Sequence, residues 1–124
     1  MLRRCKYDQI FDASCTTWEK DAETNLMFLL SVQRKANKLL MQNGYLYLSD
    51  VYNMIGINPG VYDANDIRSV GWIKTIKNIK DRMLVDFGIY DLHEVLNRRF
   101  VNGYERDVIL HFNVQGDVLK KGGK

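Results

Sequence analysis

A long run of apolar residues with helical spacing is the feature that most constrains how this chain can fold. Apolar residues recur at steps of three and four, the spacing of one face of an α-helix: Ala22, Leu26, Leu29, Ala36 and Leu40. Before this run, Thr16 and Glu19 have the spacing of a capping box. After it, Asn43-Gly44 supplies a glycine suited to the left-handed end of a helix. The pattern predicts a helix over residues 16–43.

A second, shorter helix is predicted after an extended connector at residues 45–48. Ser49 is suited to its N-cap and Gly56 to its end. The apolar residues that share one face of this helix are Leu48, Val51, Tyr52 and Ile55. Pro59-Gly60 then favours a loop, and residues 57–70 are expected to be irregular.

From Gly71 the period changes from 3.6 to 2, which is typical of strands. Residues 72–79 and 83–89 are rich in β-branched and apolar side chains. We expect them to form a hairpin whose turn lies at Lys80-Asp81. The rest of the chain predicts one more helix and one more strand, because it holds a second capping-box spacing and a second alternating run.

That helix is expected to open at Asp91 and Glu94 and to close at Asn102-Gly103. The strand covers residues 108–114, where the apolar residues alternate with their neighbours: Val108, Leu110, Phe112 and Val114. His111 falls at an outward position of this alternation, and a solvent-facing or hydrogen-bonded histidine is therefore expected.

These elements predict an α+β fold in which a long N-terminal helix and short helices pack on a small, about three-stranded antiparallel sheet. At 124 residues the chain fits one domain. Its expected parts are an N-terminal arm (1–15), a helical part (16–56), a sheet part with one short helix (71–119) and a basic tail (120–124). The apolar face of the long helix is expected to pack on strands that contain Trp72, Leu110 and Phe112.

Residue patterns typical of catalysis are missing from the sequence. The glycines form no phosphate-binding loop, and the serines sit at predicted caps or inside a helix. Asp86 and Asp91 are better explained as an exposed strand position and a helix cap than as a pair of acid–base groups. Cys5 and Cys15 are interpreted as ordinary thiols, and no histidine–cysteine spacing indicates a metal. We therefore expect no enzyme activity, no cofactor and no metal.

Positive charge is concentrated in one short stretch. The net charge is only +3, but residues 68–82 hold five basic residues against Asp81 alone: Arg68, Lys74, Lys77, Lys80 and Arg82. On a hairpin these lysines can track phosphates, although lysine also blunts exposed strand edges. A second basic group lies on the long helix, at Arg34, Lys35 and Lys38. Lys74, Lys77, Lys80 and Arg82 of the first group, and all three residues of the second, are candidate surfaces for a protein partner or a nucleic acid.

Two further interpretations are less favoured. Residues 48–58 resemble the first half of a helix-turn-helix, but Tyr52 stands where that motif keeps a small residue, and Pro59-Gly60 follows where its second helix would begin. A membrane role is not expected, since no apolar run approaches about 20 residues and no signal core follows the basic N-terminus. The expected location is therefore a cytoplasm.

Several short segments together resemble a known family. After the long helix, residues 45–52 carry an L-x-D-x-Y pattern and are followed by Ile55-Gly56-Ile57. The other segments come in order: Gly71-Trp72, residues 85–91, residues 100–105 and residues 110–116. Together they are similar to a domain found in uncharacterised proteins of phages and prophages of Gram-positive bacteria. The resemblance implies a phage context, with the cytoplasm of a bacterial host or a virion as the expected location, and it transfers no catalytic residue.

The function expected from these observations is non-catalytic binding of another protein, either a phage protein or a further copy of this chain. Trp18, Met27 and Phe28 lie partly off the main stripe of the long helix, which favours a second buried face. A virion-associated component of head, neck or tail is the leading role. An intracellular inhibitor of a host defence or other host protein is one alternative. A nucleic-acid-binding protein that uses the basic hairpin is the other.

Overall fold

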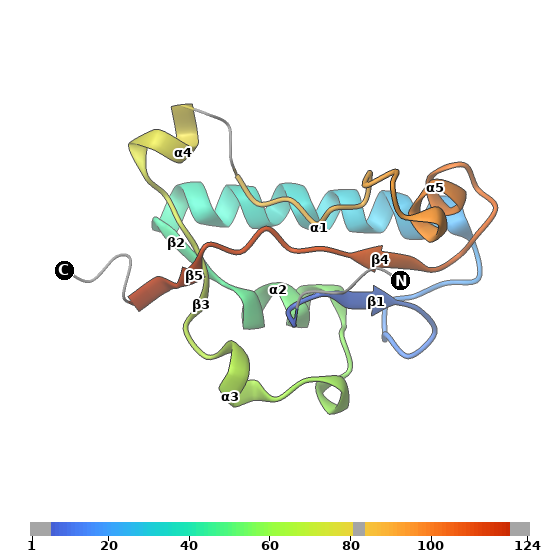
Figure 1. The fold of residues 1–124 in the computed structure, drawn as a ribbon, viewed down its shortest axis with the longest axis horizontal. Coiled ribbons are helices and arrows are strands. Elements are labelled where there is room, and N and C mark those ends of the chain that lie inside the picture. Colours follow the sequence, from blue (N-terminus) through green and yellow to red (C-terminus); the bar gives the residue numbers. More distant parts are fainter. Residues whose placement is uncertain (1–5, 81–83, 120–124) are drawn as a thin grey trace.

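A computed structural model describes residues 6–80 and 84–119 of the chain. The elements follow the order β1 (Gln9–Phe11), α1 (Ala22–Asn43), β2 (Tyr45–Tyr47), α2 (Leu48–Ile55), a 3-10 turn (Pro59–Val61), α3 (Ala64–Ile67), β3 (Val70–Ile73), α4 (Ile76–Lys80), α5 (Val95–Val101), β4 (Val108–Leu110) and β5 (Gly116–Asp117). Figure 1 shows α1 lying along the length of the molecule, with the short strands beneath it. The predicted α+β class is confirmed.

The long helix α1 ends where the sequence predicts and begins later than predicted. Gly44 adopts a left-handed φ of 85°, and its N–H donates to the carbonyl oxygen of Leu40. At the other end the cap is Asp21, whose carboxylate accepts the N–H of Thr24 at 2.8 Å. The capping box predicted at Thr16 is wrong because the Thr16 N–H donates instead to the carbonyl oxygen of Gly56.

The predicted sheet has different members. β2, β3 and β5 form a three-stranded antiparallel sheet in which Leu46 faces Trp72 across β2 and β3. β1 and β4 form a separate antiparallel pair with Ile10 opposite Ile109. The predicted N-terminal arm (1–15) therefore contains the short strand β1 at residues 9–11. Of the strand expected over residues 108–114, only Val108–Leu110 form a strand, β4, and the next strand, β5, begins at Gly116.

The predicted hairpin at residues 72–89 is wrong. β3 stops at Ile73, and α4 begins three residues later. Thr75 and Asn78 cap each other there: the Asn78 side-chain oxygen accepts the Thr75 N–H, and the Thr75 hydroxyl accepts the Asn78 N–H. This reciprocal capping stabilises a helical turn against the strand propensity of the isoleucines. The predicted sheet part (71–119) therefore holds two helices, α4 and α5.

Residues 84–89 alternate as a strand would, but they form no strand ladder. Val85, Phe87 and Ile89 are buried, while Asp86 between them is exposed as predicted. On one side the backbone is bound by amide side chains of α1, and on the other side it is bound by the segment that follows β4. This second predicted strand of the hairpin therefore runs between α1 and the C-terminal part of the chain (Figure 1).

Two predicted caps are wrong and two predicted helix ends are confirmed. α2 starts one residue before Ser49, without a side-chain cap, and α5 starts after Asp91, at Val95. Both helices end at the predicted glycines: Gly56 and Gly103 have φ values of 87° and 85°. Residues 57–70, expected to be irregular, include the short 3-10 turn and α3.

The predicted core is confirmed for most of its members, although Leu26 is only partly buried and Phe112 follows β4 instead of lying in a strand. Leu29, Ala36 and Leu40 of α1 are fully buried in one cluster with Trp72, Leu110 and Phe112. The α2 face, Leu48, Val51, Tyr52 and Ile55, joins the same cluster. Phe112 contacts two aromatic rings, with centroids 5.5 Å from Tyr52 and 5.3 Å from Phe87. Aromatic contacts of this kind link the α2 side of the core to residues 84–89.

Candidate functional site

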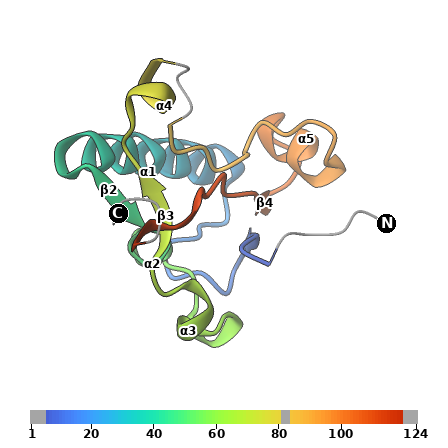
Figure 2. The same ribbon diagram turned by 60° about the vertical axis from the view of Figure 1, so that its left-hand side comes forward.

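The lysines predicted to line a hairpin lie instead on and beside α4, at the C-terminal end of α1. Lys74, Lys77 and Lys80 are all exposed. The Lys74 ammonium donates to the carbonyl oxygen of Met41 at 2.7 Å, which places a positive charge at the negative end of the α1 dipole. Lys77 and Lys80 stand on the five-residue α4, which projects from the body in both views (Figures 1 and 2). Arg82 lies outside the described residues.

An apolar groove of about 410 Å³ opens at the C-terminal end of α1, next to Lys74. It is lined by residues of the last turn of α1, of β2 and β3, and of the chain after β5: Asn43, Gly44, Tyr45, Tyr47, Ile73, Val118 and Leu119. Tyr45 and Tyr47 point to one side of β2 with their rings 5.4 Å apart, while Leu46 between them is buried. The Lys74 N–H donates to the Gly44 carbonyl oxygen, so Lys74 borders the groove, whereas Lys77 and Lys80 follow it along the chain on α4 and do not line the groove.

Large apolar side chains around this groove are exposed. Ile76 is 84% exposed, Leu119 62% and Tyr45 47%. We call this region the tyrosine–lysine surface and define it by Tyr45, Tyr47, Ile73, Lys74, Ile76, Lys77, Lys80 and Leu119. Sequence reasoning found its lysines but missed its apolar part, because residues 72–79 were assigned to a strand. The Thr75-x-x-Asn78 spacing was the available signal for the helix.

The second predicted basic group lies on a different element. Arg34, Lys35 and Lys38 are exposed on α1, between the buried positions Val32, Ala36 and Leu40. The six described basic candidates therefore form two groups, one on the side of α1 and one at its C-terminal end.

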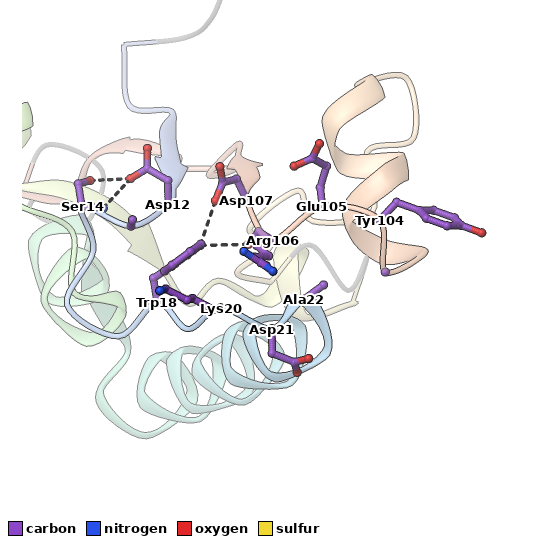
Figure 3. A pocket seen from close by; sticks show the side chains of 12 residues that line it. Asp12, Ser14, Trp18, Lys20, Asp21, Ala22, Tyr104, Glu105, Arg106 and Asp107 are labelled. Carbon is purple, nitrogen blue, oxygen red and sulfur yellow. Dashed lines mark hydrogen bonds between the residues drawn. The ribbon is translucent and has the colours of Figure 1, made fainter.

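A polar cleft of about 770 Å³ lies at the opposite end of α1. It is formed by residues 12–14 and 18–22 on one side and 103–107 on the other (Figure 3). Four carboxylates, Asp12, Asp21, Glu105 and Asp107, line it against two basic residues, Lys20 and Arg106. We call it the acidic cleft. The sequence pattern gave no sign of it, because its two walls are more than 80 residues apart.

The indole of Trp18 holds the walls of the acidic cleft together. Its N–H donates to the carbonyl oxygen of Arg106 at 3.1 Å and to the Asp107 carboxylate at 3.0 Å. Buried Asn25 of α1 adds a second link, since its amide donates to the carbonyl oxygens of Glu19 and Arg106, both at 2.9 Å. Trp18, which lies off the main stripe of the predicted helix, thus contacts its own chain.

The carboxylates of the cleft have shifted pKa values. Burial raises the pKa of Asp107, and the nearby charges of Asp12 and Glu105 raise it further, although the Trp18 hydrogen bond opposes them. Hydrogen bonds from the side chain and backbone of Thr24 lower the pKa of Asp21. A cation in this cleft would therefore relieve the repulsion between Asp107 and its acidic neighbours.

His111 was expected to be either solvent-facing or hydrogen-bonded, and in the structure it is hydrogen-bonded. Its Nδ1 lies 2.7 Å from a carboxylate oxygen of Asp8. Its Nε2 is buried without a hydrogen-bond partner and lies 3.9 Å from Asp91 and 3.8 Å from Glu94. Across residues 6–80 and 84–119, no group of three or more histidine, cysteine or acidic side chains is arranged to hold a metal ion. The cluster links the segment before β1 to the turn before α5.

Cys15 is a free, buried thiol. Burial raises its pKa, which disfavours the nucleophilic thiolate. Cys5 lies outside the described residues. Among the helices that the structure describes, none has the length and apolar character to cross a bilayer.

The fold and these surfaces define a small α+β protein with an exposed apolar groove at one end and an acidic cleft at the other. Residues 2–121 match DUF6353, a family of unknown function, and the chain belongs to this family. No curated protein and no solved structure matches it.

Proposed function

We propose that this chain acts by binding another protein through the tyrosine–lysine surface, without catalysing a reaction. The observation that carries the proposal is the apolar groove along β2 and β3, together with Ile76, which follows β3 on a projecting helix and is 84% exposed. Leaving large apolar side chains in water costs free energy that burial against a partner recovers, at about 25 cal/mol per Å².

The composition of this surface supports a protein partner with acidic residues. Tyrosine is enriched at interfaces because its ring buries a large area while its hydroxyl stays paired. Lys77 and Lys80 border the apolar centre and favour a partner with complementary negative charge. A nucleic acid fits less well, since the groove between the lysines and β2 is lined mainly by apolar and aromatic side chains.

The chemistry around His111 supports a non-catalytic role. The group on Nδ1 is a carboxylate, and the groups nearest Nε2 are two more carboxylates rather than a hydroxyl or thiol. A nucleophile-and-base pair needs the histidine within hydrogen-bond reach of the nucleophile.

The biological setting that we propose is a phage or prophage of a Gram-positive bacterium. Its support is the ordered set of short segments from Leu48 to residue 116. Within that setting we favour a virion-associated accessory component of head, neck or tail, because such a component has to bind a neighbouring protein, as the tyrosine–lysine surface would. An intracellular inhibitor of a host protein, acting in the host cytoplasm, uses the same surface and is the alternative.

A photo-crosslinking amino acid at Ile76 tests the proposed binding in cells that naturally carry the gene. We expect a covalent adduct with one defined protein, which is lost when Tyr45→Ser is added. The matched control carries the same crosslinker at Val61, which is 53% exposed in the loop before α3. Equal adducts at both positions, or none at Ile76, would show that this surface binds no protein.

A further inference from the structure

The two ends of α1 carry opposite chemistry. Ala22 at its N-terminal end lines the acidic cleft, and Asn43 at its C-terminal end lines the apolar groove next to the lysines. A helix of 22 residues is about 33 Å long, so the two surfaces cannot meet within one molecule. Figure 1 shows α4 and β5 near one end of the helix and the loop that leads from α5 into β4 near the other.

Contacts between like ends are disfavoured by charge. Two tyrosine–lysine surfaces facing each other would bring Lys77 and Lys80 of both copies together. Two acidic clefts would likewise bring Asp12, Glu105 and Asp107 together. Like charges placed opposite each other across an interface cost binding free energy. An isologous dimer through either end is therefore unfavourable, whereas the pairing of one end with the other is complementary.

We propose that the tyrosine–lysine surface of one copy binds the acidic cleft of the next copy, so that the chain assembles head to tail. This inference rests on the proposed function and names the partner as a second copy of the chain. Lys77 and Lys80 then face the carboxylates of Asp12, Glu105 and Asp107.

The shape and lining of the cleft fit this occupant. Its volume of about 770 Å³ falls within the range of pockets that hold ligands of several side chains' size, about 300–1,000 Å³. The Trp18 ring offers aromatic surface to an ammonium group and to the apolar side chain of Ile76, whereas Tyr104, 74% exposed at the rim, points away from the carboxylates (Figure 3). Figure 3 shows Asp12, Asp107 and Glu105 on the same side of Trp18, so that their charges act together on an incoming cation.

A contact between two different surfaces is heterologous. Each copy that joins leaves one free tyrosine–lysine surface and one free acidic cleft, so the assembly continues until it closes into a ring or extends as a filament. The expected solution behaviour is therefore a mass that rises with concentration through several copies rather than stopping at a dimer.

Sedimentation velocity of the purified chain tests the proposal over a concentration series at low and high salt. At low salt we expect species larger than a dimer, which dissociate near 1 M salt, where the Debye length is about 3 Å.

Charge reversal tests which surfaces meet. Lys77→Glu/Lys80→Glu and Asp12→Lys/Glu105→Lys should each weaken association at least about tenfold. An equimolar mixture of the two variants should associate again, because each supplies the charge that the other lost. Arg34→Glu/Lys38→Glu, which makes the same change on the side of α1, should leave the mass unchanged.

Three outcomes would overturn the inference: a monomer at every concentration, an assembly that stops at a dimer, or charge-reversed variants that associate as the parent does. A carboxyl-to-amine crosslinker applied to mixed heavy- and light-labelled chains provides a second measurement. It should join Lys77 or Lys80 of one copy to the cleft of another. A monomeric chain whose Ile76 crosslinker still captures a different protein would refute head-to-tail assembly while the proposed function stands.

Discussion

Asn37 of α1 binds both backbone groups of Val85. Its side-chain oxygen accepts the Val85 N–H at 2.8 Å, and its amide nitrogen donates to the Val85 carbonyl oxygen at 3.0 Å. This is the pair of bonds that a neighbouring strand would make, provided here by one side chain of a helix. One turn earlier on α1, the side-chain oxygen of Gln33 accepts the Phe87 N–H at 2.8 Å. Residues 84–89 therefore stay extended and buried without a strand partner on that side.

Asn37→Ala should lower the free energy of unfolding by about 1–3 kcal/mol, because it leaves the N–H and carbonyl oxygen of buried Val85 unpaired. Urea denaturation followed by tryptophan fluorescence measures the change. Lys38→Ala, an exposed substitution on the next residue of the same helix, should change stability by less than about 0.5 kcal/mol. If the two variants were equally stable, water or a shifted backbone would be replacing the Asn37 bonds.

The elements that the sequence predicted correctly are those that their own residues determine. The period of α1 and the glycines at 44, 56 and 103 act within a few residues, and each is found where it was predicted. The errors arose where a distant group decides the outcome. Thr16 has a good capping spacing, yet its N–H donates to the carbonyl oxygen of Gly56, just after α2, and Asp21 caps α1 instead.

The two candidate surfaces show the same limit of prediction from sequence. The lysines of the tyrosine–lysine surface were visible in the sequence because charge can be counted. The groove of this surface was not visible in the sequence, because Tyr45 and Ile73 become neighbours only when β2 pairs with β3. The acidic cleft needs the Trp18 indole to meet Arg106 and Asp107, a contact across 88 and 89 positions that no local pattern encodes.

Gly71→Ala should destabilise the protein more than Gly44→Ala. A methyl group at Gly71 would overlap the Leu46 carbonyl oxygen and come within 2.9 Å of the Tyr47 Cα, so β2 and β3 would have to separate. At Gly44 there is open space, and only the left-handed φ of 85° is unfavourable, at about 1–2 kcal/mol. Thermal melts of both variants provide the comparison. A smaller loss for Gly71→Ala would mean that the β2–β3 register differs from Leu46 opposite Trp72.

Leu29→Ala should reduce the free energy of unfolding by about 2–5 kcal/mol, since Leu29 is fully buried in the core under α1. Trp72→Ala should reduce it by about 3–5 kcal/mol, and it also removes the indole N–H that binds Asn113. Lys77→Ala, on exposed α4, should scarcely change the melting temperature in dilute protein. A stable Leu29→Ala variant would show that this face of α1 contributes little to the core.

The two carboxylates of the acidic cleft with shifted pKa values should affect stability with opposite signs. The pKa of Asp107 is raised above 3.8 in the folded protein, so the folded state binds its proton more tightly than the unfolded state does. Its contribution to stability is therefore lost as pH rises from about 3.8 through the folded pKa. The pKa of Asp21 is lowered, so its contribution is present above about 3.8 and is lost as pH falls through the folded pKa.

Asp107→Asn and Asp21→Asn separate these contributions, because asparagine keeps the oxygen that accepts from Trp18 or Thr24 but cannot ionise. As pH rises from about 2 to 6, the stability of Asp107→Asn should increase relative to the parent chain, because the penalty for an ionised, partly buried group is gone. Over the same range the stability of Asp21→Asn should decrease relative to the parent, because the charged cap is missing. Urea denaturation at a series of pH values, in protein dilute enough to stay monomeric, measures both differences. Slopes of the same sign would contradict the cleft geometry, since Asp107 would then be neither desolvated nor close to Asp12 and Glu105.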